Sequence, residues 1–250
     1  MCCFSRRVKS VTGTNIFARP AEGDQQFLVY SMTLKASEAL AMVLPLPVKS
    51  GSGEKAVTFF NLKDYPDFFR DLANGFEIPN RSLSDRFAGR ALAGHALEVF
   101  QVGDFEASYV PTVGDFSRLD ERFRLPPRTW EALPAYRNYG FAVFKLKPGA
   151  ATIHPMAFSF PRADAASLFF PTVHIHDGGV HSKAKFDHAL FCQTGPEQEL
   201  DLLGWEESRR SANLVMKMDK TKRLILGDRH FYRKKLRGNL PNQDTRVAGV

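Results

Sequence analysis

Hydrophobic and polar positions alternate along several short segments of the chain, and a period of two is typical of β-strands with one buried face. The segments that show it are separated by turn residues and cover 8–11, 15–18, 26–34, 139–146, 152–160, 169–177 and 186–193. A continuous apolar run at 39–46, closed by prolines, predicts a strand buried on both faces. We expect the first three segments to form a meander. We expect turns at Gly103-Asp104 and Asp177-Gly178-Gly179 to close hairpins, with a strand pattern resuming from Leu92.

Helical spacing is confined to a few short segments. Phe68, Phe69 and Leu72 recur at helical spacing within 64–73, and Gly75 follows them as a stop signal. Residues 213–226 are partly strand-like, and 239–250 are expected to form a loose C-terminal tail. The pattern therefore predicts a mainly β fold with a few helices (α+β), in which antiparallel sheets form a sandwich-like core. A single globular domain is expected over 2–238.

Composition limits the class of protein. The chain has 250 residues, of which 44% are hydrophobic and 24% charged, and this is enough to bury a core without disulfides. Its three cysteines, Cys2, Cys3 and Cys192, do not form a disulfide framework, which favours a reducing compartment. No segment has the length of a signal peptide's apolar block or of a membrane span. We therefore expect a cytoplasmic protein.

The positive charge lies at one end of the chain. The formal net charge is +7, and residues 206–250 carry 12 Lys and Arg against 5 Asp and Glu, which accounts for all of it. A basic region on a neutral body suits an electrostatic contact. Residues 206–246 are therefore expected to meet an anionic partner, which makes a non-enzymatic interaction protein one alternative. Aromatic residues do not interleave with the basic ones as in single-strand nucleic-acid binders.

Histidines cluster in one short stretch. His174 and His176 are two apart on a predicted strand, so their side chains should project from the same face. A hairpin at 177–179 would bring His188 opposite them, and His154 could join from the preceding strand. His-x-His on one strand with a histidine from a neighbour is a way in which β scaffolds bind transition metals.

The main functional hypothesis is therefore a transition-metal site on a β-hairpin, formed by His174, His176, His188 and His154. Zinc or copper is favoured over iron, and the bound partner would be this metal ion or a small molecule. Asp177 or Asp187 could orient a ligand ring or add a carboxylate ligand. Such a centre could serve a metal-dependent enzyme. The other interpretation is that these histidines are polar groups on a half-exposed face.

Cys2 suggests a different chemistry. Removal of Met1 would leave a free amine and a thiol on one residue, and an N-terminal nucleophile can use its own amine as base. A Met-Cys start followed by two strands resembles N-terminal nucleophile hydrolases such as choloylglycine hydrolases and class II glutaminases, in which Arg19 would occupy a comparable place on the second strand. This resemblance implies a Cys2 amidohydrolase as a second alternative. Cys3 departs from it, because a glycine usually follows the glutaminase cysteine.

Scattered blocks over residues 2–180 carry a broader resemblance. They are the early Cys2-Cys3 pair, the AMVLPLP run at 41–47, the YGFAVFKL block at 139–146 and the HPMAFSFP block at 154–161. Together these blocks resemble a family of uncharacterised bacterial proteins. Because the function of that family is unknown, the resemblance implies a shared scaffold and no activity.

Overall fold

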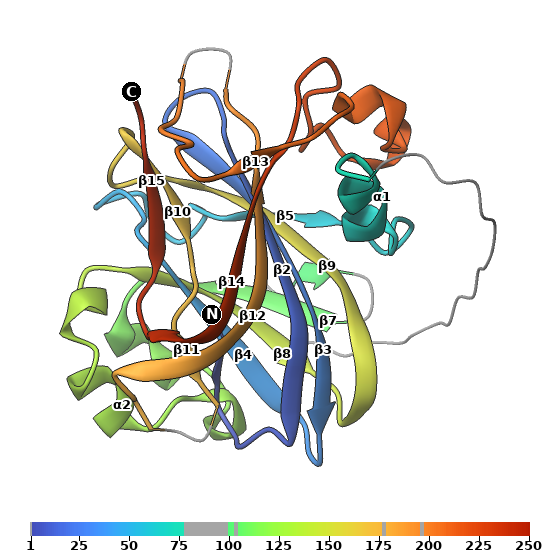
Figure 1. Cartoon of the computed structure of the whole chain (residues 1–250). Coiled ribbons are helices and arrows are strands. Elements are labelled where there is room, and N and C mark those ends of the chain that lie inside the picture. Colours follow the sequence, from blue (N-terminus) through green and yellow to red (C-terminus); the bar gives the residue numbers. More distant parts are fainter. Residues whose placement is uncertain (1, 78–99, 103–104, 177–178, 196–197) are drawn as a thin grey trace.

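Two large β-sheets packed face to face form the body of the protein (Figure 1). A computed structural model describes residues 2–77, 100–102, 105–176, 179–195 and 198–250. The mainly β fold with a sandwich-like core is as predicted. Among the described residues, no helix is long and apolar enough to span a membrane.

The first sheet has six strands in the order β11-β1-β4-β8-β7-β6. Its strands are β1 (Cys2–Phe4), β4 (Leu40–Leu46), β6 (Phe100–Val102), β7 (Phe105–Val110), β8 (Gly140–Leu146) and β11 (His174–Ile175). The second sheet has seven strands in the order β13-β14-β12-β2-β3-β9-β5. Its strands are β2 (Ser10–Pro20), β3 (Gln25–Ala36), β5 (Thr58–Asn61), β9 (Gly149–Pro161), β12 (Lys183–Cys192), β13 (Glu206–Glu207) and β14 (Tyr232–Pro241). β10 (Ser167–Phe170) and β15 (Thr245–Ala248) form a separate pair.

The main core lies between the two large sheets. All seven residues of β4 are buried, as the apolar run at 39–46 predicts. Phe144 of β8 packs against Phe158 of β9, with ring centroids 5.9 Å apart, which joins the first sheet to the second. Burial of these aromatic side chains removes a large apolar surface from water and so stabilises the fold.

The N-terminal meander predicted from three short segments is wrong. The first two segments belong to one strand, β2, which pairs antiparallel with β3 and shifts register between Thr12 and Asn15. Gly13 has a φ of +61° at this irregularity, so it forms a bulge within the strand and does not end it. A glycine that reads as a turn in the sequence can therefore sit inside a continuous strand.

Helices and turns cover the outer faces of the sheets. The helix predicted at 64–73 is present as α1 (Phe68–Asn74), and α2 (Pro127–Glu131) lies in the connection between β7 and β8. The remaining helical turns are 3-10 helices: η1 (Val113–Arg118), η2 (Glu121–Phe123), η3 (Pro134–Tyr136), η4 (Ala212–Leu214) and η5 (Met218–Lys220). The strand-like segment 213–226 thus contains 3-10 turns and no strand. Its apolar residues pack with α1 on the outer face of the second sheet.

The C-terminal residues also pair. The stretch at 239–250, expected as a loose tail, contains the end of β14 and the whole of β15, whose Val247 lies opposite Leu168 of β10. β6 and β7 pair antiparallel, with Val102 opposite Phe105. The turns predicted at Gly103-Asp104 and Asp177-Gly178, and the strand pattern from 92 to 99, lie outside the described residues.

Candidate functional site

Three of the predicted histidines meet where β11, at the edge of the first sheet, lies against β12 of the second sheet. His174 lies on β11, which pairs parallel with β1, so that Ile175 lies opposite Cys3. His188 lies on β12 of the second sheet, so β11 and β12 are not partners in a hairpin. The Asn242 side chain fixes β11, because its Oδ1 accepts the His174 N–H at 2.7 Å and its Nδ2 donates to the His174 carbonyl at 2.9 Å. We call His174, His176 and His188 the histidine trio.

The rings of the trio stack on one another. The centroids of His174 and His176 are 4.9 Å apart, those of His174 and His188 are 4.7 Å apart, and both pairs are within 28° of parallel. The Nε2 atoms of His174 and His188 are 3.1 Å apart, so one ring donates a hydrogen bond to the other. Phe186 lies 4.4 Å from His174, and Phe4 lies 5.7 Å from His176, measured between ring centroids. The trio is therefore enclosed by aromatic side chains.

Burial keeps His174 and His188 neutral. Burial lowers the pKa of His188 to about 4, although the Asp187 carboxylate, 3.7 Å from its Nδ1, opposes the shift. Burial and the neighbouring imidazoles lower the pKa of His174 to about 2. Two neutral imidazoles need only one proton between their facing nitrogens, whereas a charged pair would place two donors there.

The metal site predicted from the sequence is wrong. No group of three or more His, Cys, Asp or Glu in the described parts of the chain is arranged to hold a metal ion. The physical reason lies in the stacking, because stacked rings direct their in-plane nitrogens side by side, whereas metal ligands must converge on one point. Zinc, copper and iron are therefore not assigned to the trio, and neither is a metal-dependent reaction.

His154 is separate from the trio. It lies on β9, and its ring stacks on Phe105 of β7 with centroids 4.4 Å apart. Its Nδ1 lies 3.3 Å from the carbonyl oxygen of Pro155. The strand that carries His154 pairs with β3 and β5, well separated in the sheet order from β12 and β14. The prediction that the histidines lie together is therefore correct for His174, His176 and His188 and wrong for His154.

The cysteines occupy the first strand and the core. Cys3 and Cys192 are not part of a disulfide, and both are fully buried. Burial strongly raises the pKa of Cys192, so its thiol stays protonated. The backbone of Cys2 lies in β1, opposite His174. A nucleophilic role for Cys2 stays a prediction.

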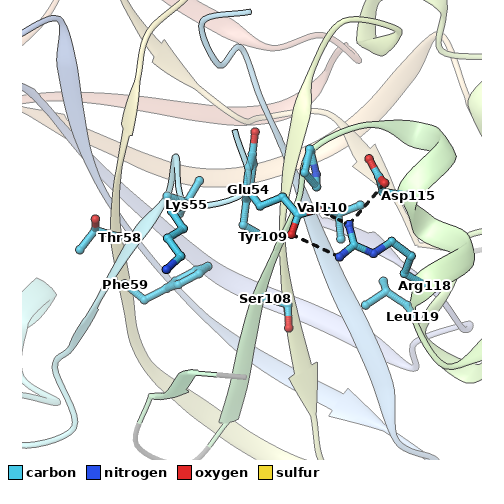
Figure 2. A pocket seen from close by; sticks show the side chains of 12 residues that line it. Glu54, Lys55, Thr58, Phe59, Ser108, Tyr109, Val110, Asp115, Arg118 and Leu119 are labelled. Carbon is cyan, nitrogen blue, oxygen red and sulfur yellow. Dashed lines mark hydrogen bonds and ion pairs between the residues drawn. The ribbon is translucent and has the colours of Figure 1, made fainter. Parts of the chain in front are cut away.

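A pocket that the sequence did not reveal opens beside β7 (Figure 2). It has a volume of about 340 Å³ and lies between the loop before β5 and helix η1. At its mouth, the Arg118 guanidinium donates to both oxygens of Glu54, at 2.6 and 3.3 Å, and lies 3.5 Å from Asp115. This ion pair holds the pKa of Glu54 below its usual range and links the loop at 49–54 to η1.

Polar groups line the wall of this pocket. Ser108 is buried, and its hydroxyl has no hydrogen-bond partner within the described residues. Burial raises the pKa of the neighbouring Tyr109 to about 12. The sequence signal was weak, because serine and tyrosine in an alternating strand read as ordinary sheet residues, and the loop at 49–54 reads only as flexible.

Comparisons with known proteins concern the fold. No model of a known protein family matches the chain. The structure is similar to the crystal structure of baculovirus P35, with a TM-score of 0.51 and 13% sequence identity, over 96% of this chain and 97% of that chain. Two further P35 structures have lower TM-scores. One is a mutated P35 after caspase cleavage (0.49, 13% identity, 96% and 98% covered), and one is the caspase-8/P35 complex (0.45, 10% identity, 95% and 96% covered).

The chain thus has a P35-like fold, and identity this low shows the fold alone. The resemblances to an uncharacterised bacterial family and to N-terminal nucleophile hydrolases are overturned by this full-length likeness. The blocks at 41–47 and 139–146 that carried the first resemblance contain β4 and β8, which pair in the core from Leu40 opposite Leu146 to Leu46 opposite Gly140. Buried apolar strands of this kind occur in unrelated sandwich folds, so these two blocks do not identify a family.

Proposed function

We propose that this chain acts by binding another protein, as an inhibitor of a caspase-type cysteine protease. The observation that supports it is the likeness to P35 over 96% of the chain and 97% of P35. P35 has been captured in a complex with caspase-8, and a mutated P35 after cleavage by a caspase. This proposal replaces the metal-dependent enzyme inferred from the histidines.

The test is direct inhibition by the purified full-length chain. Caspase-8 is preincubated with increasing amounts of the chain, and its residual activity on a fluorogenic peptide is followed. We expect activity to fall as the chain approaches an equimolar amount, and we expect a complex to elute ahead of either protein in size-exclusion chromatography. Full activity across a panel of caspases, with no complex, would overturn the proposal.

A matched control separates inhibition from simple consumption of a substrate. The mass of the chain after incubation shows whether a bond is cut, and fragment masses locate that bond. If cleavage occurs, the residue before the cut is exchanged for a near-isosteric one, such as aspartate for asparagine. We expect this variant to lose inhibition while keeping the melting temperature of the original chain. Papain, a cysteine protease outside the caspase class, should stay fully active in the same assay.

We also propose that basic residues between 206 and 246 contact an anionic partner. Exposed Lys235 and Arg237 of β14 support this proposal. Removing the chain after Glu206 is not a usable test, because it would delete β14, which pairs with β12 along ten residues. Charge reversal at exposed positions leaves this pairing intact. Binding to heparin-agarose should weaken in a charge-reversed variant, and unchanged elution would contradict the proposal.

A further inference from the structure

Four unpaired cations lie together on β12 and β14, which run side by side in Figure 1. They are Lys183, Lys185, Lys235 and Arg237, and we call them the basic strip. All four are exposed, and none has an acidic partner in the described residues. Other cations of the C-terminal region are engaged, as Arg233 is with Glu206 at 2.7 Å and Arg246 is with the Tyr139 hydroxyl at 2.8 Å. The strip is therefore unneutralised positive charge at a fixed place.

Strand register puts the strip on one face of the sheet. Lys235 lies opposite Ala189, Arg237 opposite Asp187, and Lys185 opposite Asn239. Residues two apart on a strand share a face, and directly opposite residues do too, so the four cations project to the same side. The intervening His188 lies opposite Leu236 and faces the core.

The one acid on these two strands is already occupied. Asp187 accepts a hydrogen bond from the Gly13 N–H at 2.7 Å, and its other oxygen lies 3.7 Å from His188 Nδ1. Its pKa is lowered by this side-chain contact with His188 and by the Gly13 bond. Asp187 therefore serves the β2 bulge and the histidine trio, and it leaves the strip basic.

β14 is also an edge strand over most of its length. Its only neighbour on the outer side among the described strands is β13, whose Glu206 and Glu207 lie opposite Arg233 and Tyr232. From Lys234 onward, alternate residues of such an edge direct N–H and C=O groups outward. At Gly238 φ is +91°, which departs from the extended backbone of a strand, although β14 stays paired with β12 as far as Pro241. This leaves Lys234–Arg237 as a short segment able to pair with another strand.

We propose that an extended acidic segment of a partner protein adds to β14 at Lys234–Arg237, with alternate carboxylates facing Lys235 and Arg237. This inference rests on the anionic partner proposed above and is independent of protease inhibition. Addition of a strand supplies main-chain hydrogen bonds, and opposite charges directly across the strands supply selectivity. Lysines on an edge repel other basic strands, including a second copy of this chain, so the same charges select an acidic occupant.

The strip favours a peptide over the other anionic partners. Single-stranded nucleic acids need aromatic rings on which bases stack, and the exposed positions of β12 and β14 along the strip carry none. A membrane surface would add apolar anchors beside the cations, and the strip's neighbours Asn239 and Ala189 are not of that kind. An extended chain with an acid at every second residue matches the spacing of same-face cations along β14.

The experiment measures fluorescence anisotropy with three labelled probes and the full-length chain. The first is a peptide that alternates valine and aspartate, the second is the same peptide with N-methyl groups on alternate residues, and the third is oligothymidylate. We expect the first peptide to bind. The second peptide should bind about tenfold more weakly, because N-methyl groups on alternate residues remove the main-chain N–H donors along one edge of the extended peptide. Oligothymidylate should bind more weakly than the first peptide.

Matched charge reversals locate the site. Lys235→Glu with Arg237→Glu should weaken peptide binding by about tenfold or more, because two favourable pairs become repulsive. The control, Arg209→Glu with Lys220→Glu, changes the net charge equally at two exposed positions outside the strip and should bind as the original chain does. Both variants should keep the original melting temperature.

The outcomes separate the two proposals. If N-methylation has no effect, or if oligothymidylate binds as tightly as the peptide, the acidic-strand inference is overturned while an anionic partner at the strip survives. If no anionic probe binds, or if the control variant loses as much affinity as the strip variant, both the strip and the strand are rejected. Inhibition of caspase-8 by the strip variant should equal that of the original chain.

Discussion

Mild acid should destabilise this protein through His188, and the effect can be isolated with one substitution. His188 is only 2% exposed, and its Nε2 lies 3.1 Å from that of His174. Burial holds its folded-state pKa at about 4, against the ordinary value of 6.5. Between pH 6.5 and pH 4, His188 is protonated in the unfolded chain and neutral in the folded chain. The stability contributed by neutral His188 is thus fully present above the unfolded pKa and is lost as pH falls toward the folded one.

The magnitude follows from the difference in pKa. Each pH unit in this interval costs about 1.4 kcal/mol for one group. By about pH 5 the loss from His188 alone reaches about 2 kcal/mol, and His174, which is also displaced downward, adds at most a similar amount. A loss of this size is a large fraction of the free energy of unfolding of an ordinary domain, about 5–15 kcal/mol.

One buried carboxyl works in the opposite direction. Burial raises the pKa of Asp244, although its side chain accepts hydrogen bonds from Tyr136 and from the Thr172 and Val173 N–H groups. A carboxyl with a raised folded-state pKa takes up its proton first in the folded chain, so Asp244 stabilises the fold as pH falls. Comparison of variants, rather than the pH profile of one protein, is therefore the correct measurement.

The assay measures the free energy of unfolding in urea between about pH 7.5 and pH 5. Histidine is the side chain whose ordinary pKa lies in this window. His188→Gln keeps a neutral hydrogen-bonding group, and we expect it to flatten the decline in the free energy of unfolding by about 2 kcal/mol across this window. His181→Gln removes an exposed histidine and serves as the matched control. If His188→Gln declines as steeply as the original chain, the buried neutral imidazole is not the cause and the reasoning fails.

Three other predictions test separate parts of the fold. A Cβ at Gly140 would lie 2.6 and 2.8 Å from ring carbons of Tyr109, so Gly140→Ala should cost about 1–3 kcal/mol in urea unfolding, and a smaller residue at 109 should restore part of it. Arg19 donates to the Leu224 and Arg223 carbonyls at 3.0 Å, so Arg19→Met should lower stability by about 2–4 kcal/mol, and an unchanged unfolding midpoint would contradict this. Iodoacetamide should modify Cys192 only after denaturation, as peptide mass spectrometry can show, since burial keeps this thiol protonated.

The sequence predicted strands better than it predicted which strands are neighbours. The apolar run at 39–46 and the alternating segments at 139–146 and 152–160 correspond to β4, β8 and β9. Local alternation encodes burial of one face, but it does not encode partners distant in sequence, such as β12 and β2, which pair in parallel from Ala189 opposite Asn15. The predicted meander was wrong for a related reason. The bulge at Gly13 looks like a turn in the local sequence, and only the pairing of β2 with β3 shows that the strand continues through it.

The histidine trio shows the same limit at the level of a site. Spacing in the sequence correctly placed His174 and His176 on one face, and it anticipated that His188 would join them. It did so through a hairpin that does not exist, since β11 and β12 belong to different sheets. Spacing also carries no information on ring orientation, which here produces stacking and one imidazole–imidazole hydrogen bond in place of a metal site.

The positions of His188, Asp187 and Lys185 have a common structural cause, because all three lie on β12. His188 faces the core and must stay neutral, Asp187 beside it faces outward and binds the β2 bulge through Gly13, and Lys185 lies on the same outer face as Asp187. Alternation along one strand thus places a buried neutral group and two exposed charges within four consecutive residues. Protonation of His188 would strengthen its contact with Asp187 but leave a charge beside Phe186 and the His174 ring, and the burial cost is the larger effect on its pKa. The acid sensitivity predicted for the fold and the basic strip on its surface therefore arise from opposite faces of β12.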